Sequence, residues 1–72
     1  MLVFKVVDKN KNPVKKTKVT VKVTDGGDAT AWTDKQGFVA QPITGGQHGK
    51  VLINGKEVYE GPLYVDEIVA DI

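Results

Sequence analysis

The sequence predicts an all-β fold, a single small β-sandwich domain over residues 1–72 with about seven short strands. Three observations support this prediction. Apolar and polar residues alternate with a period of two throughout residues 17–24. Asn54-Gly55 separates two strand-like runs, and this dipeptide favours a two-residue type I′ hairpin. No segment shows the periodicity of an amphipathic helix.

The composition requires an apolar core to hold this fold. A chain of 72 residues buries only about 60% of the surface that its unfolded form exposes. It contains no cysteine, which excludes disulfides and thiolate metal sites, and its single histidine cannot form a histidine-rich cluster. We therefore expect no cofactor. Stability has to come from strand packing, with self-association as a further source.

The N-terminal third matches two strands and a turn. The first expected strand covers residues 2–8, and Lys5 faces water on it. The side chains expected on its core face are Leu2, Phe4 and Val6. A turn follows over residues 9–13, where asparagine tolerates left-handed geometry and proline fixes φ. Residues 17–24 form the second strand, whose valines face inward.

The centre of the chain is a strand, a tight turn and another strand. Residues 29–33 and 38–43 are the two strand-like runs. Between them, the Asp34 carboxylate can accept hydrogen bonds from main-chain N–H groups a few residues further on. Gly37 can take the positive φ that closes such a turn. The pattern therefore predicts a turn held by Asp34 and Gly37.

The hairpin around Asn54-Gly55 has a predictable register. A two-residue loop pairs Val51 with Val58 on one face and Leu52 with Glu57 on the other.

The segments that flank this hairpin are a loop and a last strand. Residues 45–49 are rich in glycine and read as a loop. A Gly61-Pro62 turn leads to a final strand over residues 63–72. That strand has two apolar rows, which are Val65 with Val69 and Tyr64 with Ile68, Ala70 and Ile72. One sandwich has one interior, so one row must either cap an open end of the core or face outward, and we expect self-association through an outward row.

Three stretches of the sequence match successive parts of the pattern of one protein family. They are Leu2-x-Phe4-x-Val6-x-Asp8 with Asn12-Pro13-Val14 and Thr17-x-Val19-x-Val21, Thr33-Asp34-x-x-Gly37-Phe38, and Gly49-Lys50-Val51-x-Ile53-x-Gly55-Lys56. Together they resemble carboxypeptidase regulatory-like domains, within the transthyretin-like and Cna-B-like group of small immunoglobulin-like sandwiches. Phe4 and Lys11 depart from the pattern, because such domains often carry glycine there. The resemblance implies the fold, and roles as stalks, accessory modules and adhesin spacers.

Basic residues are concentrated at the start of the chain. Residues 1–24 carry a net charge of +6 and residues 25–72 a net charge of −5, and every basic residue is lysine. Lys16, Lys18 and Lys22 are candidate anion contacts on the outward face of the second strand. The lack of arginine and of interleaved aromatic residues argues against nucleic acid. A solvated sheet face is the simpler interpretation.

Catalytic and metal-binding interpretations of single residues are weak. His48 has no nucleophile nearby in the sequence, so it reads as an exposed loop residue. Some transthyretin-like proteins are hydrolases that use histidine and arginine, but this chain has no arginine. Asp25, Asp28 and Asp34 lack the spacing of a calcium loop. The resemblance also suggests an isopeptide bond from Lys5, which the alternation rejects by facing Lys5 outward.

Exposed aromatic and apolar residues are the remaining candidates. Trp32 shares a strand face with polar neighbours, so it is either the lid of the core or a contact hot spot. The candidate partner contacts are Trp32, Tyr64, Ile68 and Ile72.

The sequence favours a non-enzymatic structural or protein-binding module, with a protein partner or self-association. It would suit a component of a larger assembly such as a phage particle. The alternatives are an anionic-surface or nucleic-acid binder, and a carbohydrate-binding module using Trp32, Tyr59 and Tyr64. No signal peptide or membrane-length apolar run is present, which predicts a cytoplasmic protein or virion component without membrane contact.

Overall fold

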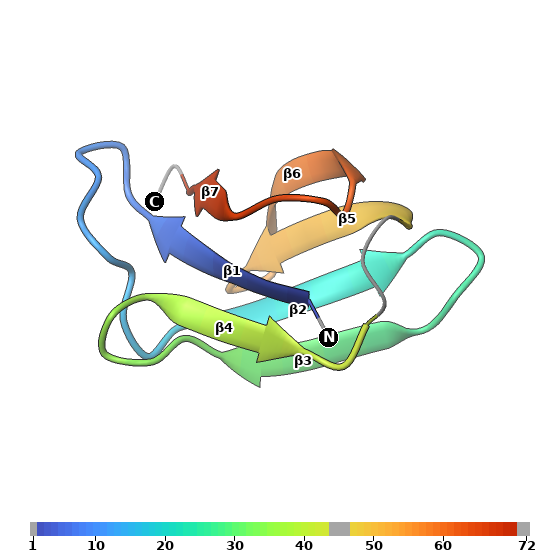
Figure 1. The fold of residues 1–72 in the computed structure, drawn as a ribbon, viewed down its shortest axis with the longest axis horizontal. Helices are drawn as coiled ribbons and strands as arrows, with labels where there is room; N and C mark the ends of the chain where they lie inside the picture. The colour runs from blue at the N-terminus through green and yellow to red at the C-terminus, as the bar shows by residue number, and fades with distance from the viewer. Residues whose placement is uncertain (1, 44–46, 71–72) are drawn as a thin grey trace.

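The computed structural model describes residues 2–43 and 47–70, and these form an all-β sandwich of seven strands in two sheets (Figure 1). The strands are β1 (Leu2–Val7), β2 (Lys18–Val23), β3 (Asp28–Trp32), β4 (Phe38–Gln41), β5 (His48–Ile53), β6 (Lys56–Pro62) and β7 (Glu67–Val69). The described residues contain no helix, as the sequence predicts. Accordingly, no helix in this part of the chain has the length and apolar character needed to cross a membrane.

The two sheets differ in strand direction. Sheet A has the order β4-β1-β7, in which β1 is antiparallel to β4 and parallel to β7. Sheet B has the order β3-β2-β5-β6 and is antiparallel throughout. The strand β1 therefore lies in the middle of sheet A, between the first strand after the central turn and the last strand of the chain (Figure 1).

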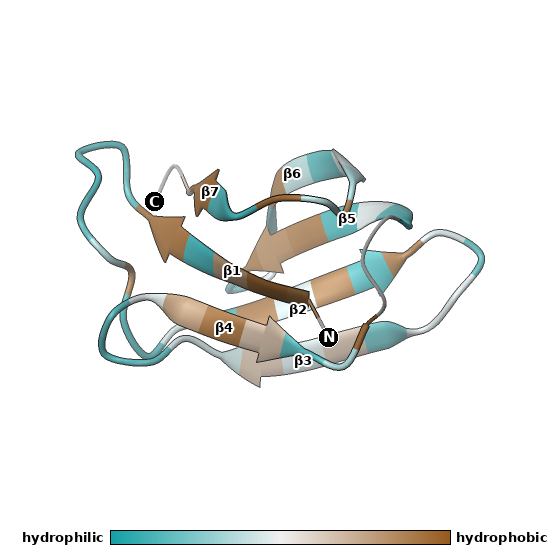
Figure 2. Ribbon diagram, viewed as in Figure 1, coloured by the Kyte–Doolittle hydropathy of each residue, from teal (hydrophilic) through white to brown (hydrophobic). Residues whose placement is uncertain are grey.

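The core lies between the sheets, where the strands present their alternate apolar residues (Figure 2). The largest fully buried apolar side chains are Phe4, Ile53, Leu63, Val6, Val7, Val19, Val21 and Val51. The predicted inward face of the first strand is confirmed, because Leu2, Phe4 and Val6 are all buried. Val7 is buried as well, on the opposite side of β1, where Pro13 of the following loop forms a β-bridge with it.

The predicted central turn is confirmed in detail. Asp34 Oδ1 accepts hydrogen bonds from the main-chain N–H groups of Gln36, at 2.8 Å, and Phe38, at 3.0 Å. Gly37 has a φ of +83°, which is the left-handed region that glycine tolerates. Its carbonyl oxygen accepts a hydrogen bond from the Val6 N–H at 2.8 Å, so the turn also joins β1.

The hairpin turn is confirmed, but its register differs from the prediction. Asn54 and Gly55 have φ values of 52° and 84°, as a type I′ turn requires. Leu52 pairs with Glu57 as predicted, whereas Val51 pairs with Tyr59 because a bulge on β6 leaves Val58 as an extra residue. The predicted Val51–Val58 pair is therefore wrong.

The end of the chain also differs from the prediction. The strand β6 continues through Gly61 and Pro62, where a turn was expected. Proline is tolerated because β6 is an edge strand that need not donate a hydrogen bond on its open side. The segment after it passes from sheet B to sheet A, so pairing in the last strand is limited to Glu67–Val69. The expected loop over residues 45–49 lies partly outside the described residues, and β5 begins at His48.

Candidate interaction surfaces

Within the described residues, no three histidine, cysteine or acidic side chains are grouped closely enough to hold a metal ion. His48 is exposed at the start of β5. The Asp34 carboxylate is used inside the central turn. A depression lined by Val23, Ile43 and residues 26–29 has Asp28 as the ionisable group of its described lining.

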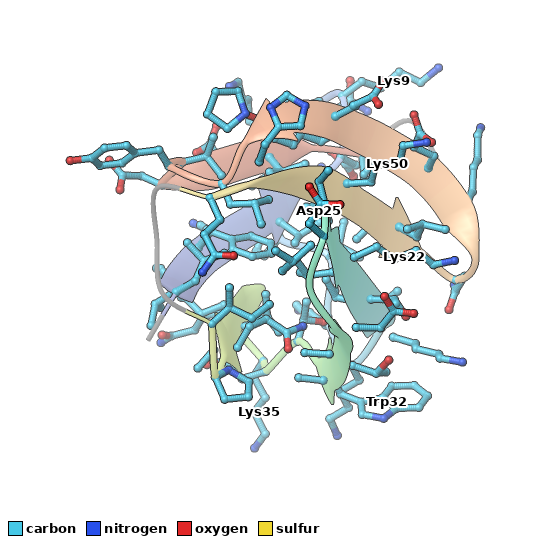
Figure 3. The ribbon with its side chains drawn as sticks, turned by 90° about the vertical axis from the view of Figure 1, so that its right-hand side faces the viewer. Lys9, Lys22, Asp25, Trp32, Lys35 and Lys50 are labelled. Atoms are coloured by element: carbon cyan, nitrogen blue, oxygen red, sulfur yellow. The ribbon has the colours of Figure 1, made fainter. Side chains whose placement is uncertain are left out.

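The predicted lysine stripe is interleaved with acidic residues in three dimensions. Lys22, on the exposed face of β2, has Asp28 as its cross-strand neighbour on one side and Lys50 on the other. Lys50 Nζ lies 3.6 Å from a carboxylate oxygen of Glu57 and 3.8 Å from one of Glu60. Lys22 and Lys50 extend from the same side of the sheet (Figure 3). This face carries both signs of charge side by side, not a continuous cationic stripe.

The remaining lysines of that stripe lie at the other end of β2. Lys18 is exposed and pairs with Trp32 across the sheet. Lys16 precedes the strand, with a φ of 48°. The three predicted anion contacts therefore do not form one row along the strand.

The predicted partner contacts are separated by the fold. Trp32 and Tyr64 are exposed, with 65% and 83% of their surface accessible, whereas Ile68 is only 3% accessible and belongs to the core. Ile72 lies outside the described residues. The row predicted to unite Tyr64 with Ile68 on an outward face is thus corrected. Tyr64 lies in the crossing segment before β7, while Ile68 of β7 points between the sheets.

The three aromatic residues of the carbohydrate hypothesis do not share a platform. Trp32 lies on β3 and Tyr59 on β6, which are the opposite edges of sheet B. The Tyr59 hydroxyl donates a hydrogen bond to the Pro62 carbonyl oxygen, and its ring is half-buried. Tyr64 lies beyond the end of that sheet.

Exposed apolar residues do gather on the outer face of sheet A. Val3, Phe38 and Val69 are 50%, 41% and 45% accessible, one on each strand of the sheet. The strand register places them around Lys5, which pairs with Phe38 on one side and Glu67 on the other. Ala40 pairs with Val3 and is also exposed. We call the surface formed by Val3, Lys5, Phe38, Ala40, Glu67 and Val69 the sheet A face.

Charged groups lie at the centre of the sheet A face. Lys5 Nζ lies 5.7 Å from the centroid of the Phe38 ring, a distance at which a cation is attracted to the ring. Glu67 Oε1 accepts a hydrogen bond from Lys11 Nζ at 2.9 Å. This hydrogen bond and the charge of Lys11, with a smaller contribution from Lys5, lower the pKa of Glu67. The sheet A face is therefore apolar at its edges and has Lys5 beside Glu67 at its centre, where Lys11 of the following loop also binds Glu67.

The sequence predicted only some of the residues of the sheet A face. Alternation along residues 2–8 turned Val3 and Lys5 outward, in agreement with the structure. Nothing local indicated that Phe38 and Val69 would flank them. Their proximity depends on β1 lying between β4 and a parallel β7, and parallel pairing of the two ends of a chain leaves no local pattern.

Comparisons with known proteins do not assign a family. No protein-family model matches the chain, and no curated protein or solved structure matches it.

Proposed function

We propose that this domain is a non-enzymatic structural module that binds another protein through the sheet A face, as a component of a larger assembly such as a phage particle. The observation that carries the proposal is the clustering of Val3, Phe38 and Val69, each close to half accessible, on one face of one sheet. Apolar residues scattered singly need no explanation, but three on the same face of one small sheet, with Ala40 beside Val3, favour a contact surface.

The composition of the face suits a protein partner. Burying apolar surface contributes about 25 cal/mol per Å², so the valines and Phe38 supply affinity. Lys5 and Glu67 give the face a fixed pattern of charge, which contributes to orientation and to selection among partners. The aromatic ring and the aliphatic side chains are of the kinds enriched in protein interfaces, whereas lysine and glutamate are depleted there, so the apolar residues carry the proposed contact.

We also propose that the domain is related to the carboxypeptidase regulatory-like group. Two features support the relationship. The turn held by Asp34 and Gly37 has the geometry that its sequence pattern predicts. Lys11, which stands where such domains often carry glycine, has a φ of 69°. Glycine is common at this position in such domains because the turn requires left-handed geometry, and Lys11 of this chain has that geometry.

Site-specific photocrosslinking tests the proposed surface. A photoreactive phenylalanine analogue replaces Phe38 in one variant, and replaces Tyr64, the most exposed aromatic residue described, in a matched control. Irradiation in the cells that encode the protein should give one discrete heavier adduct from position 38 and none from position 64. Adducts from position 64 alone would favour the contact predicted from sequence, and adducts from neither would remove the proposal.

A further inference from the structure

One edge of the sandwich has unpaired main-chain groups. In the described part of the chain, β3 pairs only with β2. Val23 N–H donates to the Gly27 carbonyl oxygen at 3.1 Å, and Thr33 N–H donates to that of Thr17 at 3.0 Å. Because these two bonds belong to the β2–β3 ladder, the main-chain N–H and C=O groups of odd-numbered residues from 27 to 33 point toward β2. The N–H and C=O groups of Asp28, Thr30 and Trp32 therefore point to the open side.

The edge of β4, the strand nearest to β3 in sheet A, is partly occupied. The hydrogen bond from Val6 N–H to the Gly37 carbonyl oxygen belongs to the β1–β4 ladder. The main-chain N–H and C=O groups of Phe38 and Ala40 therefore point away from β1, to the open side. Asp34 satisfies both main-chain groups of Phe38. Its carboxylate accepts from the Phe38 N–H at 3.0 Å, and its N–H donates to the Phe38 carbonyl oxygen at 2.9 Å. Pro42 follows directly after the strand.

The other two edges carry the features that usually prevent pairing with another chain. The strand β6 has a bulge, charged residues at Lys56, Glu57 and Glu60, and a proline at its end. The strand β7 is three residues long and follows Asp66. The strand β3 has five residues, one charge, no proline and no bulge in its pairing. It is the least protected edge among the described strands.

We propose that a second copy of this chain adds to the β3 edge, antiparallel, with Thr30 of one copy opposite Thr30 of the other. Strand addition uses the main-chain groups that the edge leaves unpaired. The two four-stranded sheets become one continuous sheet, related by a two-fold axis that passes between the two threonines. The partner is thus a second copy of this chain, bound through Asp28, Thr30 and Trp32.

The register follows from the side chains of β3. Hydrogen bonds form only when even-numbered residues of the two copies lie opposite each other, so the two-fold axis must lie at one of residues 28 to 32. Axes at Ala29 and Ala31 leave Trp32 and Asp28, respectively, without a partner on β3 of the second copy. An axis at Asp28 would place two like charges directly opposite each other. An axis at Trp32 would leave Asp28 and Thr30 of each copy beyond the end of β3 of the second copy. An axis at Thr30 pairs all three residues and sets each Trp32 opposite Asp28 of the second copy.

The charges on the exposed face complement each other in this register. Lys18 lies beside Trp32, and Lys22 lies beside Asp28, within each copy. Across the new junction the order becomes Lys18, Trp32, Asp28 of the second copy and Lys22 of the second copy. Each acid then stands between a lysine and an aromatic ring, and no like charges oppose each other at the axis. A second copy therefore fits the β3 edge in charge as well as in hydrogen bonding.

The proposed dimer is independent of the proposed partner site. The two-fold axis is perpendicular to the joined sheet, so both copies keep their sheet A faces exposed and on the same side. The contact is small, which places it among weak interfaces. A dimer that pairs through β3 would present two sheet A faces to one larger partner and raise its apparent affinity.

Two measurements on the intact chain test this inference. Sedimentation at increasing concentration should show a monomer–dimer equilibrium, and Thr30→Lys should weaken it at least about threefold because two like charges then meet at the axis. Thr24→Lys, which adds the same charge at an exposed threonine outside β3, should leave the equilibrium unchanged. Circular dichroism would check that both variants keep the sandwich.

Cysteine crosslinking tests the register, because the chain has no cysteine of its own. Thr30→Cys should form a disulfide dimer under mild oxidation, since residues at the axis meet disulfide geometry, and Asp28→Cys should not. A clean monomer at every concentration would overturn the inference, as would a dimer insensitive to Thr30→Lys or crosslinked best through Asp28→Cys. None of these outcomes affects the adduct expected from Phe38, so the two proposals fail separately.

Discussion

Replacing Gly37 by alanine should destabilise the domain through two separable effects. The φ of +83° strains any residue with a Cβ, which costs about 1–2 kcal/mol. In addition, a Cβ at this position would lie 2.7 Å from the Val6 carbonyl oxygen and 3.0 Å from Pro13 Cβ. Relieving that overlap moves the turn away from β1 and costs a further 1–3 kcal/mol, roughly the range for overpacking. We expect a total loss of about 2–5 kcal/mol.

The chain contains matched controls for each effect. Gly55 has nearly the same φ, +84°, and a Cβ there would meet nothing within 4 Å. Gly55→Ala should therefore lose only the strain term, about 1–2 kcal/mol. Gly27 also has open space around it and no left-handed φ, so Gly27→Ala should be nearly neutral. The order of stability should be Gly27→Ala, then Gly55→Ala, then Gly37→Ala.

Urea denaturation followed by circular dichroism measures these differences. A domain of 72 residues is expected to have roughly 4–11 kcal/mol of stability, so the Gly37 variant should lose a large share of it. Equal losses for Gly37→Ala and Gly55→Ala would refute the argument from close approach. A neutral Gly37→Ala would refute the left-handed turn as well.

Three further predictions concern side chains and charge. Gln41 is fully buried; its Nε2 donates to the Val19 carbonyl oxygen at 3.1 Å, and its Oε1 has no hydrogen-bond partner among the described residues. Because one hydrogen bond is gained and one acceptor is left unpaired, Gln41→Met should change the free energy of unfolding by less than about 1 kcal/mol. A loss of twice that would show that the amide is needed. Lys11→Ala should raise the pKa of Glu67 toward its ordinary value of 4.5, measured by carboxyl NMR titration. Because folding lowers this pKa, the Lys11–Glu67 contribution to stability is present above pH 4.5 and is lost as the pH falls through the lowered pKa; an unchanged pKa in the variant would contradict the contact. Duplex DNA should not bind even at low salt, because acidic residues lie among the lysines of sheet B; salt-dependent binding in a fluorescence titration would restore the anion hypothesis.

Local signals in the sequence were sufficient to predict two of the turns, whereas the turn expected at Gly61-Pro62 is part of β6. The Asp34 and Gly37 turn depends on one carboxylate and one glycine within five residues, and both act as predicted. Asn54-Gly55 determines its turn in the same way. Period-two alternation likewise predicted the core-facing residues of β1 and β2. It did not predict the burial of Val7, whose side of β1 is covered by the loop that contains Pro13.

The features that were missed depend on contacts between distant parts of the chain. The bulge at Val58 moves Val51 opposite Tyr59, and a two-residue hairpin pattern does not indicate such an insertion. The crossing of residues 63–66 between the sheets sends Ile68 into the core and leaves Tyr64 in water. The sheet A face depends on strand order, which alternation within single strands does not determine.

The most direct test of the account is the affinity of the protein captured through Phe38 for surface variants of this domain. Isothermal titration calorimetry would compare the natural sequence with Val3→Lys, on the sheet A face, and Tyr64→Lys, outside it, after circular dichroism has shown that both are folded. We predict that Val3→Lys weakens binding by about tenfold or more, which is about 1.4 kcal/mol, and that Tyr64→Lys changes it less than about twofold. Unchanged binding of Val3→Lys, with loss of binding by Tyr64→Lys, would contradict the account.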